Sequence, residues 1–510
     1  MKRLCRHIRG ILPLLALWIL PLPEAGAQWH AATQGEEGCT IGVASGSATE
    51  DGRPMVWKTR DADAEDNAVW FIREGLFSFV GVVNGGGSAP WMAVNEAGFA
   101  IVNANSLDLP GGTNSGNGAF MQLAVSTCAG VEEFERLLDS TNSTDRRTQA
   151  HFAVMDARGA AALYETAGNC YWKYDACNPT QSPGGWVIRS NFALNGGGSG
   201  GRERYLRSKV IISSLRDREV LNHTNVIRRQ MRDFSDRSGI PWAVPFQGQL
   251  GTHIPYGWVC TAYSICRAAS VSAAVIRGVL PGEPPMLSTM YVLLGQPAAT
   301  VALPFWPVGD TPYEARGDLT APLCDESRRI RKPLFAQYTD PLTRRVLDYA
   351  NTFLLADGRG GGIWQDLLPA ELMMLEETEG LLEGWRAGVP DTDAMLGAEQ
   401  EFARRAYALL RRTLIPDRPP WPSPVFTLAQ NYPNPFNGET TIGYEIPEGT
   451  FVTISLFDGL GRHLRDLVRG THEPGRYSVP LRLDGLATGL YFYRMTTGAG
   501  ALTRKLSILK

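Results

Sequence analysis

Cys39 is the residue near the start of the chain that is best suited to chemistry, and it opens the segment GCTIGVASGSATEDGRPMVWKTRDAD, residues 38–63. If the Gly38–Cys39 bond is cut, Cys39 gains a free α-amine beside its thiol. An α-amine titrates at about 8 and a thiol at about 8.5. One residue would then carry both a nucleophile and its general base, without a separate histidine. This pattern predicts covalent cleavage of an amide.

Two charged residues follow Cys39 at the end of the next strand-like run, in the segment TRDAD. Arg60 would favour the thiolate, because a fixed positive charge stabilises ionised sulfur. Asp63 could hold the α-amine through a charge-assisted hydrogen bond. The alternative is that Cys39 is a buried small hydrophobe or half of a disulfide, as internal cysteines usually are.

The position of Cys39 shortly after an export signal favours the catalytic interpretation. Residues 1–27 have a basic start, a short apolar stretch and the small residues Ala25-Gly26-Ala27, the layout of a secretory signal peptide. Residues 28–38 would be a short propeptide. No stretch approaches the roughly 20 apolar residues of a membrane span, so we expect no transmembrane segment.

Outside the cytoplasm, six further cysteines could form three disulfides, with 170/177 and 260/266 as the easiest pairs. These cysteines are Cys128, Cys170, Cys177, Cys260, Cys266 and Cys324.

Composition excludes other classes of function. The formal net charge of −3 gives no electrostatic reason to expect a nucleic-acid partner. Short basic runs such as Arg411-Arg412 are expected to be solvated helix faces. The sequence has no Cys-x-x-Cys pair and no His-x-x-x-His pair, so we expect neither a metal nor a cofactor. His151, His223 and His253 are expected to be structural.

The elements that must position Cys39 are strands and helices in mixed order, which predicts an α+β domain. Strands are expected within 40–105, 151–166, 185–194, 261–276 and 288–303, and helices within 119–139, from about 203, and within 341–414. A proline-rich linker follows at 415–424.

The first domain resembles a known family in four features taken in order. Cys39-Thr40 opens a strand, an Asp-Gly turn follows, the second strand ends in Arg-x-x-Asp, and NEAG comes at residues 95–98. This order resembles the N-terminal nucleophile (Ntn) cysteine hydrolases, the group of choloylglycine hydrolase, penicillin V acylase and isopenicillin-N acyltransferase, often called linear amide C–N hydrolases. The resemblance implies a four-layer αββα domain over 39–414 and autocatalytic exposure of Cys39.

The same resemblance implies further site residues. Ten positions after Asn95, the backbone N–H of Asn105 would help form the oxyanion hole. Asn191 in VIRSNFAL would supply the second donor from its side chain, and GRERYLR would bring Arg204 to the site. The segment departs from the family at Asp61, where Asn is preferred, and in SNFA, which replaces T-N-S-P or T-N-H-F. These departures bear on substrate class.

The last 86 residues, 425–510, have alternating strands and turns that predict a small, Ig-like all-β sandwich. QNYPNPFN, SLFDGLGR, GLYFYRM and the terminal KLSILK resemble the type A sorting domain of the type IX secretion system. The resemblance implies a Gram-negative bacterium, passage through the periplasm, and release or anchoring at the cell surface. The alternative is a carbohydrate-binding or adhesion module.

We therefore expect a secreted cysteine amidohydrolase that acts on a small N-acyl amide through an acyl-enzyme, with type IX machinery as its partner. An acyltransferase or a dipeptidase of the same superfamily would keep the fold. A non-catalytic surface-binding protein on a decayed hydrolase fold is the alternative from another class.

Overall fold

The computed structural model describes residues 38–235 apart from 107 and 112, and residues 258–339, 346–351 and 362–413. It also describes residues 426–509 apart from 447, 448, 460, 483, 484 and 499. The expected signal peptide, His253 and the linker at 415–424 lie outside these residues, as does the propeptide except for Gly38. Helices combine with antiparallel sheets throughout, which confirms the α+β class.

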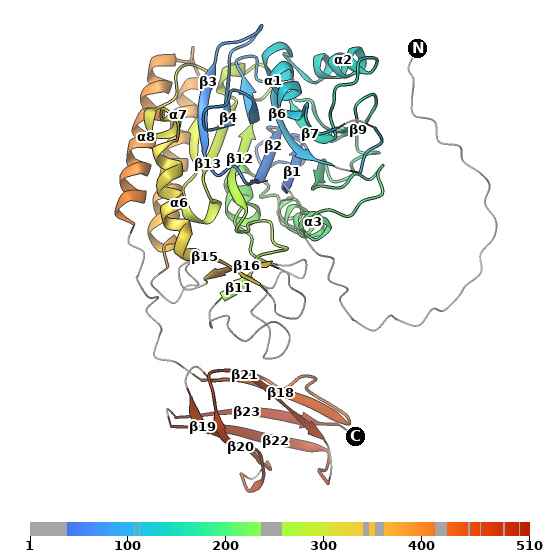
Figure 1. The fold of residues 1–510 in the computed structure, drawn as a ribbon, viewed down its shortest axis with the longest axis vertical. Helices are drawn as coiled ribbons and strands as arrows, with labels where there is room; N and C mark the ends of the chain where they lie inside the picture. Colours follow the sequence, from blue (N-terminus) through green and yellow to red (C-terminus); the bar gives the residue numbers. More distant parts are fainter. Residues whose placement is uncertain are drawn as a thin grey trace, which may run out of the picture.

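A six-stranded sheet carries Cys39 near one edge, in the strand order β10-β1-β2-β12-β13-β14 (Figure 1). All its strand pairs are antiparallel. β1, β2 and β12 are buried along their whole length, as expected of apolar strands covered on both faces. The strands are β1 Cys39–Ala44, β2 Met55–Asp61, β10 Trp186–Arg189, β12 Ser270–Arg277, β13 Thr289–Leu294 and β14 Leu303–Phe305.

A seven-stranded antiparallel sheet faces the first one and follows chain order from β3 to β9. β1 and β2 contact β6 and β7 across the gap between the sheets, and one apolar cluster contains Cys39, Val43, Val94 and Val102 from both sheets. The strands are β3 Asn67–Ile72, β4 Phe79–Asn84, β5 Pro90–Asn95, β6 Ala100–Asn105, β7 Ala150–Met155, β8 Ala161–Thr166 and β9 Tyr171–Asp175.

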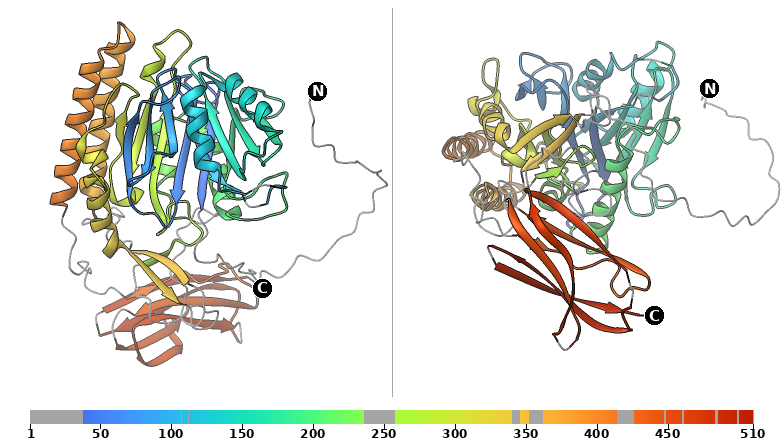
Figure 2. Two further views of the ribbon diagram at one scale, coloured as in Figure 1. Left: turned by 45° about the horizontal axis from the view of Figure 1, so that its top comes forward. Right: turned by 60° about the horizontal axis from the view of Figure 1, so that its bottom comes forward.

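Helices cover these sheets and correct two sequence predictions. The single helix expected over 119–139 is two helices, α1 Asn117–Thr127 and α2 Val131–Thr141, because the chain leaves the helix at Cys128. The long helical stretch expected over 341–414 begins with strand β16, Val346–Asn351, and continues as α7 Trp364–Arg386 and α8 Thr392–Arg412, which lie side by side (Figure 2). α3, Arg202–Asp217, packs on β1 and β10.

Smaller elements complete the first domain. β16 pairs with β11 and β15 in a three-stranded sheet. These elements are α4 His223–Asn225, the π-helix η1 Val226–Gln230, β11 Trp258–Cys260, the 3₁₀ helices η2 Pro285–Leu287 and η3 Pro297–Ala299, α5 Tyr313–Arg316, α6 Pro322–Leu334 and β15 Phe335–Thr339.

The C-terminal residues form two antiparallel sheets, in the orders β17-β18-β21 and β20-β19-β22-β23. Alternate residues of β18 and β19 are buried, and both sheets contribute to one apolar cluster that includes Ile442, Ile454 and Tyr493. The strands are β17 Thr427–Leu428, β18 Glu439–Ile446, β19 Thr450–Phe457, β20 His463–His472, β21 Gly475–Arg482, β22 Gly489–Thr497 and β23 Gly500–Ile508.

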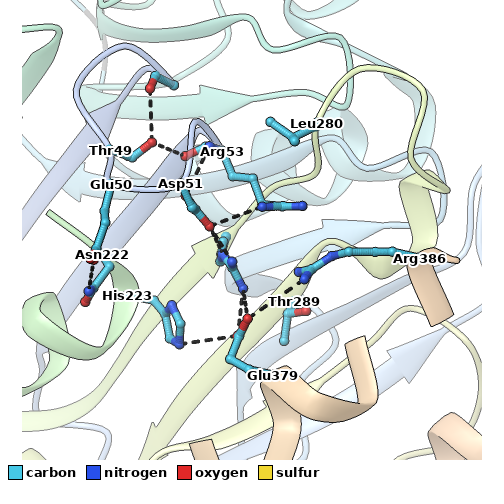
Figure 3. Close-up of polar contacts among 12 residues, drawn as sticks. Thr49, Glu50, Asp51, Arg53, Asn222, His223, Leu280, Thr289, Glu379 and Arg386 are labelled. Atoms are coloured by element: carbon cyan, nitrogen blue, oxygen red, sulfur yellow. Dashed lines mark hydrogen bonds and ion pairs between the residues drawn. The ribbon is translucent and has the colours of Figure 1, made fainter. Parts of the chain in front are cut away.

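The turn that joins β1 to β2 is held by a network of ion pairs, which we call the turn network (Figure 3). Arg277 on β12 binds Asp51 and Glu379, with Nη1 2.7 Å from Glu379 Oε1. Arg53 pairs with Asp51 and Glu283, and Arg386 lies 3.7 Å from Glu283. The network also includes His223, whose Nε2 lies 3.7 Å from Glu379, and the Tyr291 hydroxyl, which donates to Glu379.

In the described part of the chain, none of the seven cysteines forms a disulfide. The three expected disulfides are therefore absent from it. Burial raises the pKa of Cys266 to about 12, and that of Cys128 to about 11, so both thiols behave as neutral core residues. Across the described ranges, no helix combines the length and apolar character needed to cross a membrane.

Candidate active site

Cys39 is the first residue of β1 and is 6% exposed, with its thiol outside any disulfide. The strand forms because Cys39–Ala44 is an apolar run between β10 and β2, where every residue is covered. The register places Arg60 of β2 directly opposite Cys39. The two side chains thus lie on the same face of the sheet, which is the face that packs on the second sheet.

Asn191 links Cys39 to Asn105. It follows β10, and its Oδ1 accepts a hydrogen bond of 3.0 Å from the Cys39 N–H. Its Nδ2 donates to the Asn105 carbonyl oxygen at 2.9 Å. Asn105 ends β6 and its own side chain accepts from Asn117 Nδ2 at 2.8 Å. The structure therefore brings three of the expected site residues into one hydrogen-bonded chain.

Arg204 in the first turn of α3 fixes the backbone of Cys39. Its Nη1 donates to the Cys39 carbonyl oxygen at 2.6 Å and to the Thr40 hydroxyl at 3.0 Å, and its Nη2 donates to Asn191 Oδ1 at 2.7 Å. The side chain is buried. Such charge-assisted hydrogen bonds are the strong ones in proteins, so Arg204 holds Cys39 and Asn191 in one arrangement.

Arg60 lies between the two sheets rather than in solvent. Its Nη1 donates to Asn67 Oδ1 at 2.7 Å, and its guanidinium carbon is 4.8 Å from the centre of the Trp91 ring. The Ser272 hydroxyl donates to the same Asn67 oxygen at 3.1 Å. Arg60 is thus a fixed, buried positive charge in the register position opposite Cys39.

Asp63 is not brought to Cys39. It is exposed in the turn after β2, and within the described residues no hydrogen bond or ion pair joins it to Cys39. The reason is register: Asp61 is the last residue of β2, and its N–H donates to the Gly38 carbonyl oxygen at 2.7 Å. The chain then leaves the ladder, and Asp63 points into water.

Asp61 and Arg267 lie beside the Gly38–Cys39 bond instead. The buried Asp61 carboxylate accepts from Arg267 Nε at 2.7 Å and from the Ser270 hydroxyl at 2.6 Å, and lies 3.9 Å from Arg204 Nη1. A Cβ atom at Gly38 would come within 2.0 Å of Arg267 Nη2. Any other residue at this position would therefore require the Arg267 guanidinium to move. Sequence reasoning noted Asp61 but gave no signal for Arg267, which precedes β12 and comes from far along the chain.

The loop that carries Asn191 is tied down at two points by carboxylates, although its sequence NGGGSGG suggests a mobile loop. Glu165 binds Arg189 at 2.7 Å and accepts from the Leu194 and Asn195 N–H groups at 2.8 and 3.1 Å. Burial alone would raise the pKa of Glu165, but Arg189 holds it below its ordinary range. Asp108 accepts from the N–H groups of residues 193 and 198. Asn191 is therefore presented from a fixed loop.

His151 on β7 is paired with Glu165 on β8. Burial lowers the pKa of His151 to about 4. It is a neutral, fully buried side chain on β7. In the described part of the chain, no group of three or more His, Cys, Asp or Glu side chains could hold a metal ion. The site thus combines a thiol, a positioned backbone nitrogen, two asparagines and buried arginines.

Three solved structures are similar to part of the chain. Penicillin V acylase from Agrobacterium tumefaciens is 16% identical and the match covers 52% of this chain and 85% of that one, with a TM-score of 0.31. Conjugated bile acid hydrolase from Clostridium perfringens is 14% identical, and the match covers 50% of this chain and 89% of that one, with a TM-score of 0.27. The Caenorhabditis elegans N-acylethanolamine-hydrolyzing acid amidase ortholog is 12% identical, and the match covers 48% of this chain and 94% of that one, with a TM-score of 0.30.

No curated protein matches the chain in sequence. The C-terminal residues do match a family model, over 430–509, which is described as the secretion system C-terminal sorting domain. This range contains QNYPNPFN, SLFDGLGR and GLYFYRM, the segments on which the sorting domain was expected. The chain therefore ends in a domain that matches a secretion system sorting domain.

Proposed function

We propose that this protein is a secreted cysteine amidohydrolase that cleaves a linear, N-acyl type amide C–N bond through an acyl-enzyme on Cys39. The observation that carries the proposal is the hydrogen bond from the Cys39 backbone nitrogen to Asn191, whose amide in turn binds the Asn105 carbonyl. The nitrogen that must become the general base is thus already oriented beside the thiol of the same residue.

Cleavage of the Gly38–Cys39 bond is the first step of the proposal. The Gly38 carbonyl oxygen accepts from the Asp61 N–H, and Arg267 and Arg204 lie against Gly38. Hydrolysis of this bond leaves a carboxylate on Gly38 and an α-amine on Cys39. The amine keeps Asn191 Oδ1 as its hydrogen-bond acceptor, which leaves its lone pair available for the thiol proton.

The chemical step then needs no other side chain as base. The amine takes the proton of the Cys39 thiol, sulfur attacks the substrate carbonyl carbon, and the carbonyl oxygen becomes an oxyanion. The ammonium returns the proton to the leaving amine as the C–N bond breaks and a thioester forms. Water, deprotonated by the same amine, hydrolyses the thioester and releases the acid and the thiol.

Two donors are proposed for the oxyanion, the Asn105 N–H and Asn191 Nδ2. An amide nitrogen carries two hydrogens, so Nδ2 can hold the Asn105 carbonyl and the oxyanion together. Preorganised donors of this kind stabilise the charge that develops in the transition state. Arg60 would favour the thiolate form of Cys39 from its position across the strand pair.

The architecture and export are part of the same proposal. Residues 28–38 form the propeptide, residues 39–414 a four-layer αββα hydrolase domain, and residues 425–510 an Ig-like sorting domain that type IX machinery recognises. The match over 430–509 supports the last of these assignments. The protein would be released or held at the surface of a Gram-negative cell.

The test is a mass measurement combined with a substrate panel. The exported protein should begin at Cys39, and the mature form should hydrolyse at least one member of a panel of N-acyl amides. An exported chain that runs from Gln28 through Cys39, together with inertness toward the panel, would instead favour a surface-binding protein. Product analysis with an added amine acceptor separates hydrolysis from acyl transfer.

A further inference from the structure

A cavity outside the Cys39 site lies between α3 and the π-helix η1 and has a volume of about 460 Å³. Five arginines line it. Arg207 is on α3 and Arg218 directly follows that helix, whereas Arg228 and Arg229 are on η1 and Arg232 comes just after it. We call this cavity the arginine pocket. Like charges gathered in one concave site repel one another, so an arrangement of this kind needs a compensating charge.

Two of these arginines are already neutralised. Arg207 makes a bidentate pair with Asp233, with contacts of 2.8 and 2.9 Å. Arg232 is buried against both oxygens of Glu371, at 2.6 and 2.7 Å. Five guanidiniums less two carboxylates leave three positive charges.

The other three arginines, Arg218, Arg228 and Arg229, are exposed, and none forms an ion pair with any residue that the structure describes. These three guanidinium groups therefore carry the excess positive charge of the pocket, and they are able to bind an anionic ligand.

Two of these three arginines are on a rare element. η1, Val226–Gln230, is a π-helix in which the Met231 N–H bonds the Val226 carbonyl at 3.0 Å. Short π-helical turns are uncommon and are frequent at functional sites. The extra residue in this turn brings Arg228 and Arg229, neighbours in sequence, to the same cavity. The π-helical turn and the exposed positive charges thus lie at the same cavity.

Apolar side chains also line the pocket. Ile211 and Leu215 on α3 and Phe234 after η1 are buried. Trp364 stacks on Phe234, with ring centres 6.1 Å apart and ring planes inclined by 29°. Val210, also in the wall, is 52% exposed. A ligand that fits this pocket has an anionic group on an apolar body.

We propose that the arginine pocket binds a phosphate group carried on an apolar chain. A phosphate monoester has a charge of about −1.5 to −2 at neutral pH and three terminal oxygens, which suits three guanidiniums better than a carboxylate does. Guanidinium pairs with phosphate in a bidentate manner. The apolar chain would lie against Ile211, Leu215 and Trp364. This function is distinct from amide cleavage, since Cys39, Asn105, Asn191 and Arg204 are not among the residues that line the pocket.

The test is calorimetric titration of the full-length protein with three probes: inorganic phosphate, octyl phosphate and octanoate. Octyl phosphate should bind at least ten-fold more tightly than either of the others. In Arg228→Gln/Arg229→Gln its affinity should fall at least ten-fold. The matched control is Arg411→Gln/Arg412→Gln, which removes the same charge from an adjacent, exposed pair at the end of α8 and should leave the affinity unchanged.

A second arm separates a free ligand from a lipid headgroup. Flotation with phosphatidylcholine vesicles containing phosphatidic acid, competed by octyl phosphate, would assign the phosphate to a membrane surface, and absence of flotation despite octyl phosphate binding would assign it to a soluble molecule. Equal affinity for octanoate, no binding of any probe, or unchanged affinity in Arg228→Gln/Arg229→Gln would overturn the proposal. Arg218→Gln, a single exposed change, should weaken binding in the same direction and guards against a folding defect in the double variant.

Discussion

The two ends of the β1–β2 hairpin both gather charged residues, but they are built differently. At the turn end, three arginines and three carboxylates alternate in the turn network, and each arginine contacts two of the carboxylates. At the Cys39 end, three arginines accompany a thiol and two asparagines, and in the described part of the chain Asp61 is the carboxylate that contacts Arg204 and Arg267.

This difference distinguishes a structural cluster from a candidate site. The turn network has a buried histidine, half-buried carboxylates and shifted pKa values, yet none of its members is a thiol or a serine, and its charges balance. The Cys39 end has no histidine, but it has a nucleophile, a positioned nitrogen and a surplus of positive charge. Perturbed titration alone is therefore a poor guide to function here.

The largest expected effect is loss of activity in Cys39→Ser. Removal of a catalytic nucleophile costs on the order of 10³-fold or more, and serine fits the same space, so the thermal unfolding midpoint should not change. Hydrolysis of the best N-acyl amide and the N-terminal mass would be measured together. Cys177→Ser, at an exposed cysteine, is the control and should retain full activity. Retained activity in Cys39→Ser would remove the distinction between the two ends.

Asn191→Ala should have the next largest effect. It removes the acceptor for the Cys39 nitrogen and a proposed oxyanion donor, and the loss of one such donor lowers kcat by about 10² to 10³-fold. The matched control is Asn195→Ala in the same loop, whose amide binds Glu165 and Tyr174 instead. Equal kcat values for the two variants would contradict the role given to Asn191.

Arg277→Ala should have the opposite signature, a loss of stability without loss of chemistry. It leaves Asp51 and Glu379 without their shared partner, and breaking a buried ion pair costs about 3 kcal/mol of unfolding free energy. Urea titration would measure this change, and kcat per folded molecule should stay at the wild-type value. Arg405→Ala breaks the exposed pair with Glu377 and should cost at most about 1 kcal/mol.

The smallest effect concerns pH. Burial lowers the pKa of His223 from its ordinary 6.5 to about 4. Between these values the unfolded chain binds a proton that the folded protein does not, so the free energy of unfolding falls as pH falls from 6.5 to 4. The loss from this residue is about 2 kcal/mol between pH 6.5 and 5.

His223→Phe keeps the stacking on Tyr291, whose ring centre is 4.3 Å away, and should remove roughly half of the slope, because His151 is shifted to the same pKa. Urea midpoints across the pH range would report it. His463→Phe, at a side chain that is 52% exposed, should leave the slope as in the wild type. An unchanged slope in His223→Phe would contradict the burial argument.

Much of the fold could be predicted from local sequence, because apolar alternation and turn residues mark strands whether or not their partners are known. The strands around Cys39 and the start of α3 were placed in this way. The prediction was wrong where tertiary contacts determine the secondary structure. The apolar face of 119–139 is continuous in the sequence, yet the helix is interrupted where the Val125 and Cys128 carbonyl oxygens accept hydrogen bonds from Asn95 Nδ2. β16 within the expected helix forms because it has two partner strands.

The same distinction between local sequence and tertiary contacts applies to the residues of the candidate site. Cys39, Asn105, Asn191 and Arg204 could be found from motif order, and their mutual contacts follow from the folded sheet. The choice between Asp61 and Asp63 depends on where β2 ends relative to Gly38, which spacing does not determine. Arg267 belongs to no motif and reaches the site only because β12 pairs with β2. The roles of these residues remain predictions until the variants are measured.

The tight fit around Gly38 has a practical consequence for anyone who alters the leader. A Cβ atom at that position would come within 2.0 Å of Arg267 Nη2, which is the far end of a flexible side chain, so any other residue there would require the guanidinium to move from its place beside Asp61. The last residue of a foreign leader would thus decide whether the Arg267–Asp61 ion pair keeps its geometry.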